Sequence, residues 1–356
     1  MTNNMAAVIK YKNVKRLYFE GKNQIEALTG QVETLQNAVA NQRMSQSRTA
    51  LDDSEYATRF NRLNGAINNL SFNIRKDWRK VPQWLEKYVS PDALHTGKQE
   101  MTAIGRAVIS RWIIEEVFNK CFHPGLDPQL SAHLKEIELS IRGNAYTMHS
   151  QEEFDALTAK IVNWRMATLD GLSKKLNSSS APENRTLLTT KSTTNLTARL
   201  YQYLNDPPPP GVEGSTSMIV ELAIAIAANL PLESRDVAIA YPLPGEKVQP
   251  HLMEVEKTGL PTLEAHKREE DSDDDDDSEP EQGGKGDKGK GMLTIQVSSL
   301  GVIILQRLLG KLCLHQHFLT ERTGAPKDTG IVRFAGFIAL EVRGRQVLIK
   351  APVWTI

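Results

Sequence analysis

DDSEYATRFNRLNGAINNLSFNIRKDW, residues 52–78, is the stretch that decides the fold of this chain. Its apolar side chains recur alternately every four and every three residues, which is the spacing of one continuous stripe along an amphipathic α-helix. The stripe consists of Tyr56, Phe60, Leu63, Ile67, Leu70, Ile74 and Trp78. Asp52, Asp53 and Ser54 supply capping groups and negative charge at the start, and Pro82 is expected to end the helix because it lacks an amide donor.

Four basic residues gather near the end of this predicted helix: Arg75, Lys76, Arg79 and Lys80. They form either a patch for phosphate or another acidic partner, or a solvated helix end whose positive charges complement the helix dipole. We favour the second interpretation, because a nucleic-acid-binding domain usually carries a larger basic excess than this one.

Upstream, residues 11–44 predict a coiled-coil helix. A heptad frame places Tyr11, Tyr18, Ile25, Val32 and Val39 at a, and Val14, Gly21, Leu28, Leu35 and Gln42 at d. From Ile25 to Val39 the a positions are β-branched and the d positions are Leu, which favours a parallel two-stranded coiled coil. Only about two heptads are free of interruption, so a helix packed on its own chain is the alternative. We predict a homodimer that associates through Tyr18, Ile25, Leu28, Val32, Leu35 and Val39.

Downstream, residues 51–205 predict a helical body. Three further apolar stripes are Met101, Ile104, Val108, Trp112 and Val117; Leu130, Leu134, Ile137 and Ile141; and Phe154, Leu157, Ile161, Trp164 and Leu172. Residues 206–265 predict a proline-rich spacer, a buried helix at Met218–Leu230 and an extended segment that wraps over the body. The prolines of that segment argue against regular strand pairing. The predicted fold class is mainly α.

Charge is strongly segregated along the chain, although 43 basic and 43 acidic residues cancel overall. The net charge is +7 for residues 1–205, −12 for 206–291 and +5 for 292–356. Residues 266–291, an acidic run followed by a Gly/Lys stretch, predict a disordered linker, because such a composition cannot form a core. Ser272 and Ser278 precede acidic residues and are candidate phosphorylation sites, each of which would add about −1.5 to −2 charge. The linker could then screen the basic residues, or it is a passive tether.

Residues 292–356 differ in composition from the rest. Leu300–Leu314 predicts an apolar helix, and the segments 339–342 and 346–349 predict a β-hairpin that turns at Arg343–Arg345. The segment is either a small sheet-bearing module or a tail without a fold of its own, because 65 residues bury only a marginal core.

No catalytic, cofactor-binding or metal-binding residue can be assigned from motifs. Gly284–Gly291 has the glycine spacing of a phosphate-binding loop but no Ser or Thr after the lysine, and no strand precedes it. Cys313, His315 and His317 supply three metal ligands where a structural zinc site needs four. We therefore expect no cofactor and no enzyme, with an enzyme of unrecognised site as an alternative.

Two cysteines exclude a disulfide-stapled scaffold, and the first residues lack the apolar core of a signal peptide. The apolar stretch near Met218 spans about 13 residues, short of the ~20 that cross a membrane. We therefore expect an intracellular protein, cytoplasmic or nuclear, without membrane association.

Four segments carry a resemblance to known sequences. Residues 52–78, together with Pro231–Val237, Met253–Glu256 and Gly259–Pro261, resemble a group of uncharacterised proteins of filamentous fungi. The resemblance covers roughly residues 10–265 and implies a helical body behind a coiled coil, with no catalytic residue to carry over. The function that we expect is a self-associating scaffold or adaptor, and the alternative is a nucleic-acid or chromatin-associated regulator.

Overall fold

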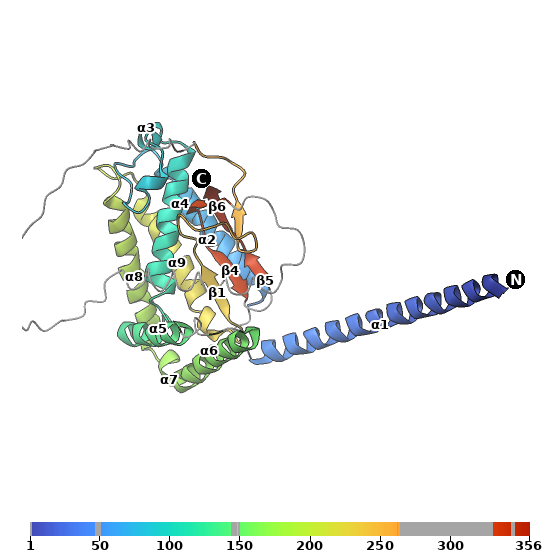
Figure 1. Cartoon of the computed structure of the whole chain (residues 1–356). Helices are drawn as coiled ribbons and strands as arrows, with labels where there is room; N and C mark the ends of the chain where they lie inside the picture. The colour runs from blue at the N-terminus through green and yellow to red at the C-terminus, as the bar shows by residue number, and fades with distance from the viewer. Residues whose placement is uncertain are drawn as a thin grey trace, which may run out of the picture.

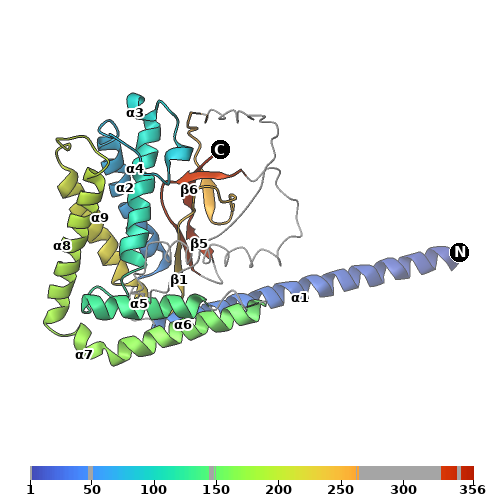
Figure 2. The same cartoon turned by 60° about the vertical axis from the view of Figure 1, so that its left-hand side comes forward.

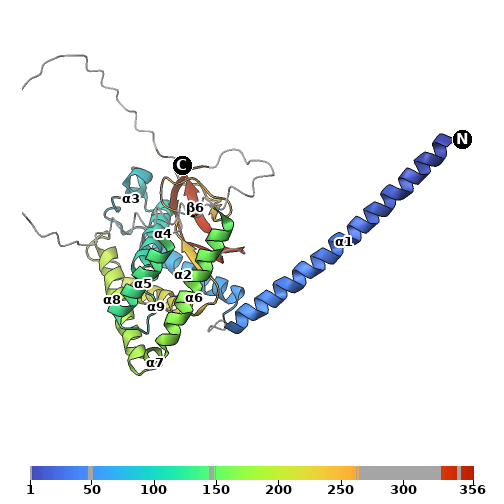
Figure 3. The same cartoon turned by 60° about the horizontal axis from the view of Figure 1, so that its bottom comes forward.

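The protein consists of one long helix and a folded body of helices and two small sheets (Figure 1). The computed structural model describes residues 2–46, 51–143, 148, 150–261, 263, 330–342 and 346–356. Helix α1 (Thr2–Gln46) extends away from the body in Figures 1 and 3, and the body contains all the other elements. The predicted mainly α fold is confirmed.

Four helices form the centre of the body. They are α2 (Asp53–Asn73), α4 (Gln99–Ile113), α8 (Ser180–Tyr201) and α9 (Val212–Ala227), with α2 packed against α4 and α9, and α9 against α8. The predicted stripe of α2 is confirmed as core, since its seven side chains from Tyr56 to Trp78 are at most 4 % exposed. Gly105 of α4 faces Ser71 of α2 so closely that an added Cβ would lie 2.9 Å from the Ser71 Cβ. The two helices therefore pack with almost no side chain between them.

Helix α2 ends earlier than predicted. Asp52 caps its start by accepting a hydrogen bond from the Glu55 amide, but the helix stops at Asn73 rather than near Pro82. Trp78 instead forms an isolated antiparallel bridge with Leu204, and the Asn205 amide donates to the Asp77 carbonyl. This contact with the chain after α8 pulls the segment out of the helical path.

Two helices lie across one end of this core, as Figure 2 shows. They are α5 (Pro128–Gly143) and α6 (Gln151–Gly171), and the capping box of Ser150 and Glu153 begins α6. Short elements complete the helical part: the 3-10 helix η1 (Glu86–Tyr88), α3 (Ala93–Thr96), the π-helix η2 (Ile114–Phe118), α7 (Ser173–Leu176) and the 3-10 helix η4 (Leu230–Leu232).

The apolar stripe predicted for α5 is only partly buried. Leu134 and Ile141 pack against buried apolar residues, but Ile137 is 46 % exposed, whereas the neighbouring Ser131, Glu138 and Arg142 are buried. A helix can bury charged side chains when they are paired, and the carboxylate and guanidinium of this face pair with each other and with Asp236. The hydropathy pattern of α5 therefore does not reveal its most buried face.

Within the described residues, six short strands form two sheets. The strands are β1 (Val237–Ala240), β2 (Met253–Val255), β3 (Val332–Ala335), β4 (Ala339–Val342), β5 (Gln346–Ile349) and β6 (Ala351–Thr355). One sheet has the order β1-β4-β5 with antiparallel pairing, and the other has the order β2-β6-β3, in which β6 is parallel to β2 and antiparallel to β3. The expectation that prolines prevent regular pairing of residues 241–261 is wrong for β2. The predicted pairing of 339–342 with 346–349 is confirmed, while its turn lies outside the described residues.

The C-terminal strands are central to both sheets. Strand β4 lies between β1 and β5, and β6 lies between β2 and β3, so neither an independent module nor an unfolded tail describes residues 330–342 and 346–356. Arg333 of β3 is 2 % exposed, donates to the carbonyls of Tyr88 and Pro261 at 2.6 Å each, and forms an ion pair with the buried Glu100. The predicted helix Leu300–Leu314 and the linker 266–291 lie outside the described residues.

By length and composition, Val212–Leu232 is long and apolar enough to cross a membrane, but one such helix is weak evidence for a membrane span. It contains α9, whose Ile219, Val220 and Ala223 are fully buried against the helices of the body. The prediction of a buried helix at this place is therefore confirmed. A core helix of this kind has the same apolar character as a membrane span.

Candidate functional site

Three surfaces of the described chain are candidates for function: the apolar face of α1, the basic cluster that follows α2, and a groove beside β1. The candidate phosphorylation sites Ser272 and Ser278 lie outside the described residues.

Helix α1 exposes the stripe that the sequence predicts for self-association. Tyr18, Ile25, Leu28, Val32 and Leu35 are between 50 % and 68 % exposed, as are Val14 at a neighbouring d position and the nearby Leu17 and Phe19. Val39 continues the stripe along the helix axis, although its side chain lies outside the described part of the chain. The body therefore leaves the whole described seam uncovered.

The length of α1 makes this exposure energetically significant. At a rise of 1.5 Å per residue, a helix of 45 residues is about 68 Å long. An isolated helix in water is marginal, and most helices gain their stability by packing an apolar face against something else. The described side chains of α1 make only local bonds, such as the Thr29 and Thr34 hydroxyls to carbonyls four residues earlier. The described body does not supply this packing for α1.

The basic cluster lies in the irregular segment after α2 and not on a helix, which corrects the predicted basic helix end. Arg75 stacks on the Phe72 ring, with its guanidinium carbon 3.6 Å from the ring centroid, and donates to the Phe72 carbonyl. Arg79 donates to the Gln202 carbonyl at 3.2 Å. Both arginines thus hold the segment in place, while Lys76 and Lys80 are exposed and make no ion pair with the described chain.

Folding adds a fifth cation to this cluster. The Tyr203 ring is approached by the Lys80 ammonium at 6.0 Å and by the Arg199 guanidinium at 5.8 Å, and it stacks against Trp78. Arg199 is more than a hundred residues away in sequence, so no local motif indicates its contribution. Paired cations beside an accessible aromatic ring suit a phosphate-bearing or otherwise anionic ligand.

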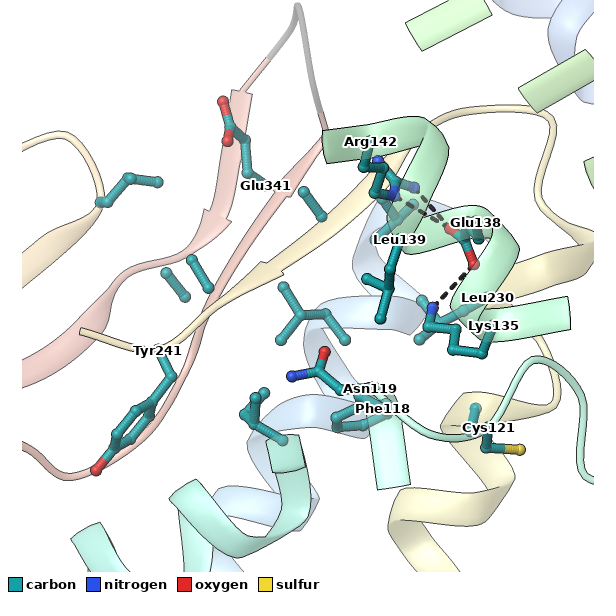
Figure 4. A pocket seen from close by; sticks show the side chains of 18 of the residues that line it. Phe118, Asn119, Cys121, Lys135, Glu138, Leu139, Arg142, Leu230, Tyr241 and Glu341 are labelled. Carbon is teal, nitrogen blue, oxygen red and sulfur yellow. Dashed lines mark hydrogen bonds and ion pairs between the residues drawn. The ribbon is translucent and has the colours of Figure 1, made fainter. Parts of the chain in front are cut away.

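The third surface is a groove between helix α5 and the edge of β1, which we call the β1 groove (Figure 4). It encloses a cavity of about 160 Å³. Its walls come mainly from η2 with Asn119, helix α5, strands β1 and β4, and the loop that leads to β2, with further residues from α6, the end of α9 and η4. In Figure 4, Leu139 of α5 and Asn119 both project into the space beside β1.

A charged cluster braces the helical wall of the β1 groove. Arg142 donates to both oxygens of Asp236, at 2.6 and 2.9 Å, and to Glu138 at 2.8 Å, and Lys135 pairs with Glu138 at 2.9 Å. Burial alone would raise the pKa of Glu138, but the charges of Lys135 and Arg142 outweigh it and lower that pKa. Each charge has a partner, so the cluster holds α5 against the segment before β1 rather than transferring protons.

The polar groups without partners lie elsewhere in the β1 groove. The Asn119 side chain makes no hydrogen bond within the described chain, and Gln249 Oε1 and Arg165 Nε are buried without one. Asn119 follows the π-helix η2, and π-helical turns occur frequently at functional sites. Of these groups, the half-buried Asn119 amide is the one open to a bound molecule, because Gln249 Oε1 and Arg165 Nε have almost no accessible surface.

The cysteine near the β1 groove is not set up as a nucleophile. Burial raises the pKa of the Cys121 thiol to about 11, so that it stays protonated at neutral pH. Its sulfur lies 3.7 Å from the Ser131 hydroxyl, and burial lowers the pKa of the nearby His123 to about 4. The His123 Nδ1 already accepts a hydrogen bond from the Gly125 amide. Among the described residues, no three His, Cys, Asp or Glu side chains form a group that could hold a metal ion.

The sequence predicted the α1 stripe and four of the five cations, but it did not predict the β1 groove. The only local signal was the alternation of Ala238 and Ala240 with larger residues in β1. Comparisons with models of protein families, with curated proteins and with solved structures find no match to this chain. The resemblance to filamentous-fungal proteins therefore stays a prediction.

Proposed function

We propose that this protein is a non-enzymatic intracellular adaptor that self-associates through α1 and so presents two copies of its body to other proteins. The observation that carries the proposal is the exposed a/d stripe from Val14 to Leu35 on a helix that extends away from the body (Figure 3). A second copy of α1 is the occupant that fits, because β-branched residues at a and Leu at d pack best against the same pattern in a parallel pair.

Site-specific cross-linking tests the proposal and its parallel orientation together. In a full chain in which Cys313 is changed to Ser, Leu28→Cys places a thiol at a d position and Asn23→Cys places one at the f position on the opposite side. Cys121 is buried and protonated, so it should not react. A short bis-maleimide should link Leu28→Cys into a covalent dimer and leave Asn23→Cys a monomer. Equal linking at both positions, or linking at neither, would contradict the seam.

The second candidate function is binding of nucleic acid by the basic cluster, and the Tyr203 ring shared by Lys80 and Arg199 favours it. Binding of a fluorescent oligo-dT should then weaken steeply with salt, because each phosphate contact releases counterions. A variant with Arg75, Lys76, Arg79 and Lys80 all changed to Gln should bind more weakly and show a shallower salt slope. If the oligonucleotide is not bound at low salt, this candidate is excluded and the adaptor proposal is unaffected.

A further inference from the structure

Strand β1 has one unpaired edge, and the β1 groove runs along it. In the sheet order β1-β4-β5, β1 pairs only with β4 among the described strands. The amide and carbonyl groups that β1 turns away from β4 make no hydrogen bond to any other part of the described chain. An edge of this kind is a template for one more strand.

The lining of the β1 groove places this edge inside it. All four residues of β1 line the cavity, although successive side chains of a strand point to opposite faces. A cavity over one face of the sheet would be lined by only two of them. The space therefore extends around the backbone edge of β1 and is not confined to one face of the sheet.

The floor of the β1 groove is kept open by small side chains. Ala238 is paired across the sheet with Glu341, and Ala240 with Ala339, so three of these four neighbouring side chains end at Cβ. Leu139 and Arg142 of α5 stand opposite. Helix α5 stands beside this edge and blocks the approach of another folded sheet, which argues against β1 pairing with β1 of a second copy.

We infer that the β1 groove binds an extended peptide segment of a partner protein, which adds a strand to the free edge of β1. Main-chain hydrogen bonds to the edge would supply affinity, and the alternate side chains of the peptide would supply specificity. Asn119, whose side chain projects into the space beside β1, is placed to bond the peptide. This inference deepens the proposed adaptor function, on which it rests for its biological meaning, by naming what the body binds.

Charge narrows the chemistry of the peptide. The three cations that line the β1 groove, Lys135, Arg142 and Arg165, lie against Glu138 and Asp236. These cations are therefore already compensated, and the complementary segment is uncharged and small along the Ala238–Ala240 floor.

A selected peptide provides the probe. Phage-displayed random twelve-residue peptides would be selected on the full chain, and the recovered sequence would be synthesised with fluorescein and titrated by fluorescence anisotropy. Ala238→Phe fills the floor of the groove and should weaken binding at least tenfold. Ala159→Phe, on the exposed face of α6, is the matched control and should leave the Kd unchanged. Asn119→Ala, a smaller change that keeps the groove open, should weaken binding about threefold to tenfold.

Backbone methylation distinguishes strand addition from other modes of binding. N-methyl groups placed one at a time along the peptide should weaken binding at every second residue, because only alternate amides of an added strand face β1. Any of three results would overturn the inference. They are a Kd that N-methylation leaves unchanged, equal Kd values for Ala238→Phe and Ala159→Phe, and recovery of no peptide. The solution mass of each variant is measured in parallel. None of these changes lies in α1. If the full chain is a dimer but no peptide is recovered, the result contradicts only this inference and not the adaptor proposal.

Discussion

Helices α1 and α2 carry similar apolar stripes, but only α2 buries its stripe in the described body. The stripe of α2 is at most 4 % exposed from Tyr56 to Trp78, whereas that of α1 is at least 50 % exposed from Val14 to Leu35. Spacing alone is nearly the same in both helices, because each repeats apolar residues every three or four positions. The difference shows that a stripe predicts burial but does not say whether its partner belongs to the same chain.

Substitution of a core residue in α2 should have the largest effect on the free energy of unfolding and so tests this comparison most strongly. Phe60→Ala should lower the free energy of unfolding of the body by about 3–5 kcal/mol, because it removes a fully buried ring and leaves a cavity. Leu28→Ala in α1 should change it by less than about 0.5 kcal/mol. Urea unfolding followed by tryptophan fluorescence measures both, since all five tryptophans lie outside α1. Comparable losses in the two variants would mean that α1 packs on the body.

A substitution in the charged face of α5 should have the next largest effect on the free energy of unfolding. Glu138→Gln keeps the shape of the side chain but leaves Arg142 and Lys135 without one carboxylate, and should cost about 1–3 kcal/mol at pH 7. The folded-state pKa of Glu138 is lowered, so its contribution is complete above the unfolded value of ~4.3 and is lost as the pH falls below it. The difference between wild type and variant in urea unfolding should therefore shrink from pH 6 to pH 3. A difference that stayed constant over this range would show that Glu138 acts by shape alone.

Loss of the α2 cap should have a smaller effect. Asp52→Ala removes the acceptor of the 2.7 Å hydrogen bond from the Glu55 amide and should destabilise the body by about 1 kcal/mol. Asp52→Asn, which retains an acceptor oxygen, serves as the control and should recover most of that loss. If both variants unfold at the wild-type urea concentration, the helix start is held by its packing and not by its cap.

Salt should have the smallest effect. The ion pairs of α1, Arg16–Glu20 at 3.7 Å and Lys22–Glu26 at 3.8 Å, are exposed and join residues of the same helix, each worth about 0.3–0.5 kcal/mol. Raising NaCl from 0.1 to 0.5 M should therefore shift the dimer dissociation constant less than about fivefold in sedimentation equilibrium. A much larger shift would mean that charge, and not the apolar stripe, holds the dimer together.

The sequence predicted the parts of the fold that depend on local periodicity. Residues 52–73 form a helix whose buried face follows from spacing, and the hairpin of β4 and β5 follows from alternation on either side of a turn. The end of α2 could not be predicted, because Trp78 is drawn away by Leu204, a contact across more than a hundred residues.

The candidate site depends on contacts between distant residues, which explains why most of it could not be predicted. Arg142 is buried because Asp236 neutralises it from 94 residues away, so hydropathy did not reveal that this charged face of α5 is buried. The β1 groove needs α5, β1 and β4 to meet, and the sequence predicts the pairing of β4 with β5 but not its pairing with β1. The α1 stripe was accessible to prediction because it depends on one continuous helix.

The solution mass of the full chain, measured by light scattering at several concentrations, tests self-association through α1 most directly. The variant Ile25→Gln, Leu28→Gln, Val32→Gln makes the stripe polar, and the control Asn23→Gln, Ala27→Gln, Thr34→Gln adds the same three glutamines on the opposite face of the helix. The wild type and the control should be dimers, and the stripe variant should be a monomer with an unchanged body. A monomeric wild type, or a stripe variant that remains a dimer, would contradict the account.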